Sequence, residues 1–188
     1  RADLDQNFAI FCQDPTAILL LSQNSHLLKN IPEKALNHVI TEGKHKGKSV
    51  VYGLTSSRLG QEILLKRPDV VGKISKKALN HIIDNHEEAE RGRSPVFWLC
   101  VFSEGHRILR ENNGVVEKIS RVAFNAPIAD EKFDNSSPFS DLFYSEKGLK
   151  LLHDTRLHEL IDCDTLIRPV HIPDLMNYSS PVQFMSSF

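Results

Sequence analysis

Lys34-Ala35-Leu36-Asn37-His38-Val39-Ile40 returns 43 residues later as Lys77-Ala78-Leu79-Asn80-His81-Ile82-Ile83. A looser third copy, Val122-Ala123-Phe124-Asn125, follows after another 45 residues. A fixed period of roughly 20 to 50 residues is typical of stacked supersecondary units, each too small to bury its own apolar face. The spacing therefore predicts about four units of 43–45 residues in this chain of 188 residues.

Two further blocks recur at the same spacing. Residues 47–54 match residues 92–99, and residues 60–64 match residues 105–109 and then 148–152. Because the blocks return in the same order each time, the repeat covers whole units.

Each unit predicts helices. Ser94-Pro95 is a helix start, because serine caps free backbone N–H groups and proline at the first helical position loses no hydrogen bond. Ser49 and Ser137-Pro138 repeat this start. The apolar positions of residues 77–83 fall on one helical face, and no stretch alternates as a strand does. The sequence predicts an all-α fold, a short α-solenoid of helical repeats.

Two segments resemble the helix pair of an ankyrin repeat: Ser94-Pro95-Val96 and Ser137-Pro138-Phe139. Gly105 and Gly148 then correspond to the glycines of the inter-helix turns. That family opens its first helix with Thr-Pro-Leu. Ankyrin repeats run roughly 33 residues, so the longer period here implies an extra helix, the Ala-Leu-Asn segment, replacing the family's β-hairpin finger. An armadillo- or HEAT-like stack is the alternative. The pattern is also similar to arrays in effectors of intracellular bacteria.

The repeats predict one domain over residues 1–167, followed by a different segment at residues 168–188. The approximate repeat boundaries are 1–48, 49–93, 94–136 and 137–167. The last segment contains proline and serine but stays apolar. We expect it to cap the last repeat, or to form a tail that binds another chain.

Bulk properties exclude several classes of protein. The formal net charge is −1, and Lys and Arg do not line up on repeated positions, so nucleic-acid binding is not expected. No run approaches the roughly 20 apolar residues that span a bilayer, so membrane insertion is not expected. Three cysteines cannot all pair and no C-x-x-C occurs, which favours a reducing compartment. That is the cytoplasm, or the host cytosol for a secreted bacterial effector.

We expect no catalytic residues, no metal site and no cofactor. The chain has nine histidines, but His38 and His81 are equivalent repeat positions, so a repeated packing role is predicted for both. Walker, G-x-S-x-G and H-E-x-x-H motifs are absent from the sequence. A Cys163/His158 nucleophile–base pair is the weakest alternative. The sequence predicts a protein that is not an enzyme.

Positions that vary between copies are the candidates for partner binding, because the kept positions serve stacking. The loop at residues 41–48 is basic, and its equivalent at 84–93 is acidic. One site in the first helix holds Ile10, Gly53, Trp98 and Asp141 in successive copies, and Trp is enriched in interface hot spots. The alternatives are solvated loops and a Trp98 packed between repeats. The predicted partner-binding residues are Lys44, His45, Lys46, Lys48, Trp98, Glu87, Glu88, Arg91 and Asp141.

These features predict a non-enzymatic scaffold that binds a partner protein through its repeat loops and helical face. The alternative is a substrate-recognition or regulatory domain of a larger enzyme or bacterial effector. The chain begins at Arg1 rather than Met, so we expect a piece of a longer protein, and further domains of the same chain are possible partners.

Overall fold

The structure is a computed structural model that describes residues 2–84, 90–128, 136–168, 170–172 and 177–181. The described residues are predominantly helical, which confirms the all-α prediction in its coarse form. The helices are α1 (Ala2–Phe11), α2 (Pro15–Gln23), η1 (Ser25–Asn30), α3 (Glu33–Leu36), α4 (Val50–Thr55), α5 (Arg58–Lys66), α6 (Pro68–Gly72), α7 (Lys76–Leu79), α8 (Pro95–Val101), α9 (Ser103–Glu111), α10 (Asn113–Val116), α11 (Arg121–Asn125), α12 (Pro138–Phe143), α13 (Glu146–Asp154), η2 (Arg156–Leu160) and α14 (Cys163–Ile167). The strands are β1 (Val170–Ile172) and β2 (Asn177–Ser179).

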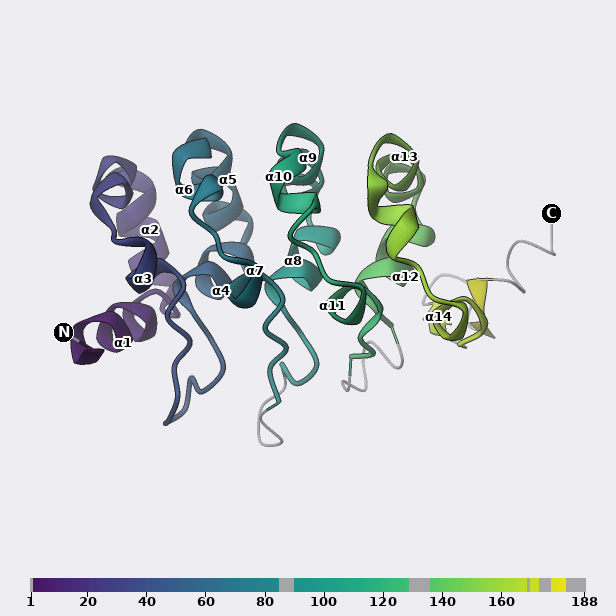
Figure 1. Cartoon of the computed structure of the whole chain (residues 1–188), viewed down its shortest axis with the longest axis horizontal. Helices are drawn as coiled ribbons and strands as arrows, with labels where there is room; N and C mark the ends of the chain where they lie inside the picture. Colours follow the sequence, from purple (N-terminus) through teal and green to yellow (C-terminus); the bar gives the residue numbers. More distant parts are fainter. Residues whose placement is uncertain (1, 85–89, 129–135, 169, 173–176, 182–188) are drawn as a thin grey trace.

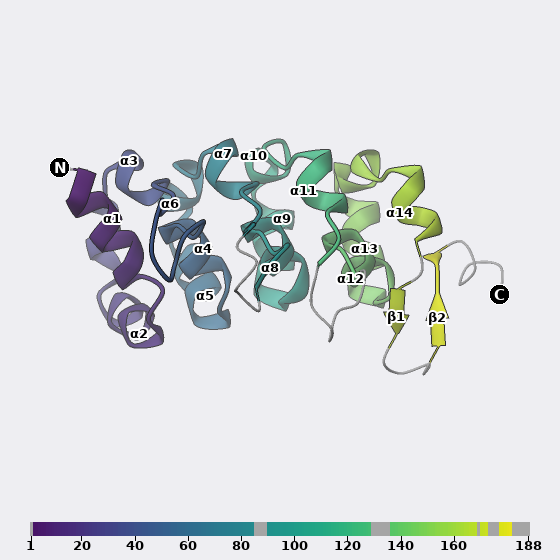
Figure 2. The same cartoon turned by 90° about the horizontal axis from the view of Figure 1, so that it is seen from below.

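Helix pairs follow one another in a row from the N-terminus to the C-terminus (Figure 1). The helices α2, α5, α9 and α13 lie along one side, where each packs on the next. The helices α1, α4, α8 and α12 form a second row, also in successive contact, and Figure 2 shows the row from below. We call this second row the inner helices and the first row the outer helices.

The predicted serine caps of the inner helices are confirmed. The Ser94 hydroxyl accepts a hydrogen bond from the Phe97 backbone N–H at 3.2 Å, and Ser49 accepts the equivalent bond from Tyr52 at 3.1 Å. Ser137 and Ser140 cap each other in a reciprocal capping box. Each cap satisfies a donor that the helix cannot, so the repeated serines fix where each inner helix begins.

The repeated glycines lie inside the outer helices rather than in the turns before them, which corrects the sequence interpretation. Gly60, Gly105 and Gly148 are in the first turn of α5, α9 and α13. A Cβ added to Gly105 would lie 2.3 Å from the carbonyl oxygen of Leu99, and the other two positions are as tight. Glycine is required because each outer helix crosses close to the backbone of its inner helix.

The short helices expected at the Ala-Leu-Asn segments are present as α3, α7 and α11, but they do not replace a hairpin finger. After α3, the backbone N–H of Ile40 donates to Lys48, and that of Gly47 donates back to Ile40, both at 2.8 Å. Ile83 exchanges the same pair of bonds with Arg93 and Gly92. Each loop therefore closes like a hairpin, with the short helix added before it. Gly47 and Gly92 have φ of 88° and 84°, a left-handed conformation that favours glycine. The repeat period of the sequence does not reveal this conformation.

A repeated asparagine joins each unit to the next. Asn80 donates from Nδ2 to the Lys118 carbonyl and accepts at Oδ1 from the Ser120 N–H, both at 2.7 Å. Asn37 makes the same pair with Lys73 and Ser75, at 2.8 and 2.7 Å. Asn125 bonds Leu160 at 2.7 Å and Asp162 at 3.3 Å. We call the contacts made by Asn37, Asn80 and Asn125 the first, second and third junctions.

The segment after residue 167 differs from the repeats. Strands β1 and β2 pair antiparallel, with Val170 opposite Ser179, so this part of the segment is not helical. In α14, Ile167 takes the position that Asn125 holds in the preceding copy, and it is 63% exposed. The series of junction asparagines thus stops before this segment.

Cys12 and Cys100 are buried at equivalent positions, and Thr55 is buried between them in the repeat. All three cysteines are free thiols. Burial raises the pKa of Cys12 to about 12 and raises that of Cys100 well above its ordinary value. Thiols held protonated in this way are poor nucleophiles, so these two residues serve packing.

Candidate partner-binding face

Trp98 lies on the inner helix α8 and is half-buried. Its ring stacks on Phe102, with centroids 5.8 Å apart and an interplanar angle of 9°, and meets the edge of buried Phe97 at 4.9 Å. The Arg93 guanidinium carbon stands 5.0 Å from the centroid of the Trp98 ring, within cation–π range. The indole Nε1 is closed off from solvent and has no hydrogen-bond partner in the described part of the chain.

Asp141 holds the same register on the next inner helix, α12. The residue is half-buried, but its Oδ2 is shielded from solvent and accepts no hydrogen bond from any described residue. Burial raises the pKa of Asp141 to about 7, and the nearby positive charge of Arg93 offsets only part of that rise. Among the described residues, the Trp98 indole N–H therefore lacks an acceptor and the Asp141 Oδ2 lacks a donor. We call Arg93, Trp98 and Asp141 the Trp98 cluster.

Arg93 was missed as a site residue by sequence reasoning, which counted it only among the charges of the loop at residues 84–93. The signal was available, because Lys48 occupies the same repeat position and Lys48 Nζ stands 5.8 Å over the Tyr52 ring, as Arg93 stands over Phe97 at the same distance. A basic residue just before the serine cap, four or five residues before an aromatic residue, marks this cation–π contact.

The predicted loop residues do not form one free surface. Lys44 and Lys46 are exposed, whereas His45 and Arg91 are half-buried. Lys48 pairs with Glu90 of the following loop, which binds the two loops together. Glu87 and Glu88 lie outside the residues that the structure describes. The structure therefore places Arg93 next to both Trp98 and Asp141, whereas Lys44 and Lys46 are exposed on the basic loop.

His38 and His81 line one cavity between α3 and α7, with Lys34 and Lys77 at its edge. Burial lowers the pKa of His81, and Lys77 lowers it further. Within the described ranges no group of three or more His, Cys, Asp or Glu side chains is placed to hold a metal ion.

No protein-family model, no curated protein and no solved structure matches this chain. Among the described helices, none combines the length and apolar character needed to cross a membrane.

Proposed function

We propose that the protein is a short α-solenoid of ankyrin-like helix pairs that binds a partner protein on its inner face, at the Trp98 cluster. The repeated junction bonds of Asn37, Asn80 and Asn125 support the solenoid, because they join consecutive units with one geometry. Free cysteines fit a reducing compartment, the cytoplasm or a host cytosol.

The observation that carries the proposal is the buried carboxylate oxygen of Asp141 without a donor, beside a half-buried tryptophan. A buried acceptor without a donor costs about 1–3 kcal/mol. Folded chains retain such costs mainly where function requires them. A partner that turns Asp141 or Trp98 outward can supply the missing bond and cover the indole ring. Because Asp141 is an acceptor when ionised, the complementary group is a donor, best a basic side chain.

The test is affinity capture from native-cell lysate, with the protein as bait in four forms: wild type, Trp98→Ala, Asp141→Asn and Ile10→Ala. Ile10 holds the same register on α1 and is 37% exposed, so Ile10→Ala controls for loss of an apolar side chain. We expect a protein retained by wild type and Ile10→Ala, and reduced at least about tenfold by Trp98→Ala. Circular dichroism and thermal unfolding check that each bait is folded.

Acidity provides a second measurement on the same captured protein. Because the pKa of Asp141 is raised to about 7, its carboxylate is mostly ionised at pH 8 and mostly protonated at pH 6. Wild type is expected to retain more partner at pH 8, and Asp141→Asn is expected to remove that difference. Equal retention by Trp98→Ala and wild type would place the binding surface elsewhere.

A further inference from the structure

The third junction contains a cavity where the second junction contains a lysine side chain. In the second junction Lys118 donates from Nζ to the carbonyls of Gly72, at 3.0 Å, and Ile74, at 2.8 Å. In the first junction Lys73 donates to the carbonyl of Lys29 at 3.1 Å. The accepting residues 29 and 72 are equivalent in the repeat, so one ammonium position is used twice.

Leu160 holds the corresponding position in the third junction. The carbonyls that would receive the ammonium are those of Glu117 and Ile119, the equivalents of Gly72 and Ile74. Between the described residues, no hydrogen bond reaches either carbonyl oxygen. Two main-chain acceptors at the equivalent repeat positions are therefore left without a donor among the described residues.

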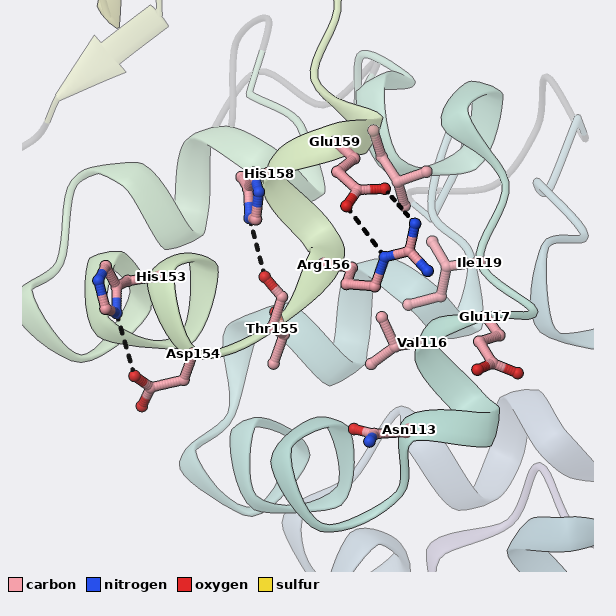
Figure 3. A pocket seen from close by; sticks show the side chains of 11 residues that line it. Asn113, Val116, Glu117, Ile119, His153, Asp154, Thr155, Arg156, His158 and Glu159 are labelled. Carbon is pink, nitrogen blue, oxygen red and sulfur yellow. Dashed lines mark hydrogen bonds and ion pairs between the residues drawn. The ribbon is translucent and has the colours of Figure 1, made fainter.

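A cavity of about 540 Å³ lies at this place, between α10 and η2 (Figure 3). Asn113, Val116, Glu117 and Ile119 line one part of it, and residues 153–156 and 158–160 line the rest. The two apolar side chains suit a lysine stem, which buries its methylene groups along apolar surface while its charged end meets acceptors. The lining also carries three acidic side chains, Asp154, Glu117 and Glu159, beside one arginine and two histidines.

That arginine, Arg156, does not take the place of the missing lysine. Its Nε and one terminal nitrogen donate to the Glu159 carboxylate at 2.9 and 2.8 Å, and Figure 3 shows the side chain turned toward Glu159. No hydrogen bond joins it to the Glu117 or Ile119 carbonyl among the bonds of the described residues. Asp154 pairs with Arg110 at 3.7 Å, and Glu117 is exposed without such a pair in the described chain.

We infer that this cavity binds the ammonium group of a lysine side chain supplied by a partner protein. The partner's Nζ takes the position that Lys118 Nζ takes in the second junction, donating to the Glu117 and Ile119 carbonyls, with the Glu117 carboxylate opposite the charge. The site lies on the side of the outer helices and does not depend on the Trp98 cluster.

The probe is Nα-acetyl-lysine N-methylamide, titrated into the ¹⁵N-labelled protein and followed by NMR. The matched probe is the norleucine analogue, which has the same stem without the ammonium group. We expect saturable shifts at the amides of residues 116–119, with binding at least about tenfold tighter for the lysine probe. Equal binding of both probes, or no shift at these amides, would overturn the proposal.

Two variants and one further probe sharpen this result. Leu160→Lys supplies the ammonium from within the chain, so it should abolish binding of the lysine probe, whereas Leu160→Met should retain it. Leu160→Lys should also melt about 2 °C above Leu160→Met. A simple diamine that binds as tightly as the lysine probe would contradict recognition of a lysine residue, because it lacks the peptide groups. Retained lysine binding in a folded Leu160→Lys variant would place the site elsewhere.

Discussion

The second and third junctions join similar units with different completeness. At the second, the side chains that cross between units include Asn80, Lys118, and Gln61, whose Nε2 donates to the Trp98 carbonyl at 2.9 Å, and Arg58 also pairs with Glu104 at 3.5 Å. At the third, His106 replaces Gln61 and, among the described residues, bonds the Cys100 carbonyl of its own unit alone, and Leu160 replaces the lysine.

Both proposed binding sites lie at the third junction. There, among the described residues, acceptors have no donors at the Asp141 carboxylate and at two carbonyls beside the cavity. Arg121 still crosses this junction, donating to the Glu159 carbonyl at 2.9 Å. From this difference we infer that polar groups left without partners at one junction of a repeat protein predict a partner-binding surface better than charge alone.

The largest expected effect concerns the charge on α12. At the position equivalent to Asp141, helix α4 carries the uncharged Gly53, which packs against the Cys12 carbonyl. The folded state raises the pKa of Asp141 from 3.8 to about 7, so it binds the proton more tightly than the unfolded chain does. Stability is then present at low pH and is lost as the pH rises from about 4 to 7.

Asp141→Asn should remove that loss. We expect it to unfold at about the same urea concentration as wild type at pH 4, and to be about 2–4 kcal/mol more stable at pH 8. Urea unfolding across this pH range measures the difference. A stability gain that is the same at every pH would show that ionisation of Asp141 does not destabilise the folded chain.

The second prediction removes the junction asparagines. Asn80→Ala leaves the Lys118 carbonyl and the Ser120 N–H without their partner, and we expect a loss of about 2–3 kcal/mol of unfolding free energy. Asn125→Ala should cost about 1–2 kcal/mol, because its bond to Asp162 is longer, 3.3 Å against 2.7 Å. Asn113→Ala, at an exposed asparagine, is the control. Equal losses from both variants would contradict the contrast between junctions.

The third prediction compares the two residues at the ammonium position. Lys118→Met should lose about 1 kcal/mol, since it removes two hydrogen bonds while keeping an apolar stem. Leu160→Met should change stability by less than about 0.5 kcal/mol, because no such bond exists there. Thermal unfolding monitored by circular dichroism suits both variants. A loss in Leu160→Met as large as that in Lys118→Met would argue against the missing cation.

The smallest effect is expected at the end of the asparagine series. Ile167→Asn should alter unfolding free energy by less than about 0.5 kcal/mol, since Ile167 is 63% exposed. An exposed side chain at this position makes few contacts, so we expect little gain from restoring asparagine. A clear stabilisation in chemical denaturation would reveal a receiving backbone beside α14.

Much of the helical framework could be predicted from the sequence. Ser94-Pro95 and its copies marked the inner helices, because capping is local chemistry. Trp98 and Asp141 were singled out because their repeat position tolerates Ile, Gly, Trp and Asp, which predicted a surface position, whereas the structure half-buries both side chains and buries Gly53. Local rules and the repeat itself carried these predictions.

The rest depends on how units are placed against one another. The period showed that Asn80 was kept, but its bonds to Lys118 and Ser120 follow from the stagger between units, which sequence spacing does not give. The loop closure at Ile83 and Gly92 was missed for a related reason, since two backbone bonds suffice and no alternating strand pattern is needed. In the sequence Leu160 does not differ from other apolar residues. Only the bonds of Lys118 at the equivalent position show that an ammonium group fits there.

The junction asparagine addresses only main-chain atoms of the next unit, a carbonyl and an N–H. Every residue except proline offers both groups, so the contact does not depend on which side chains the neighbour carries. A unit can therefore be duplicated or exchanged without redesigning its acceptor. Such a chain can change length by tandem duplication while each copy is free to diverge, which is how Trp98 and Asp141 can occupy the same register with different chemistry.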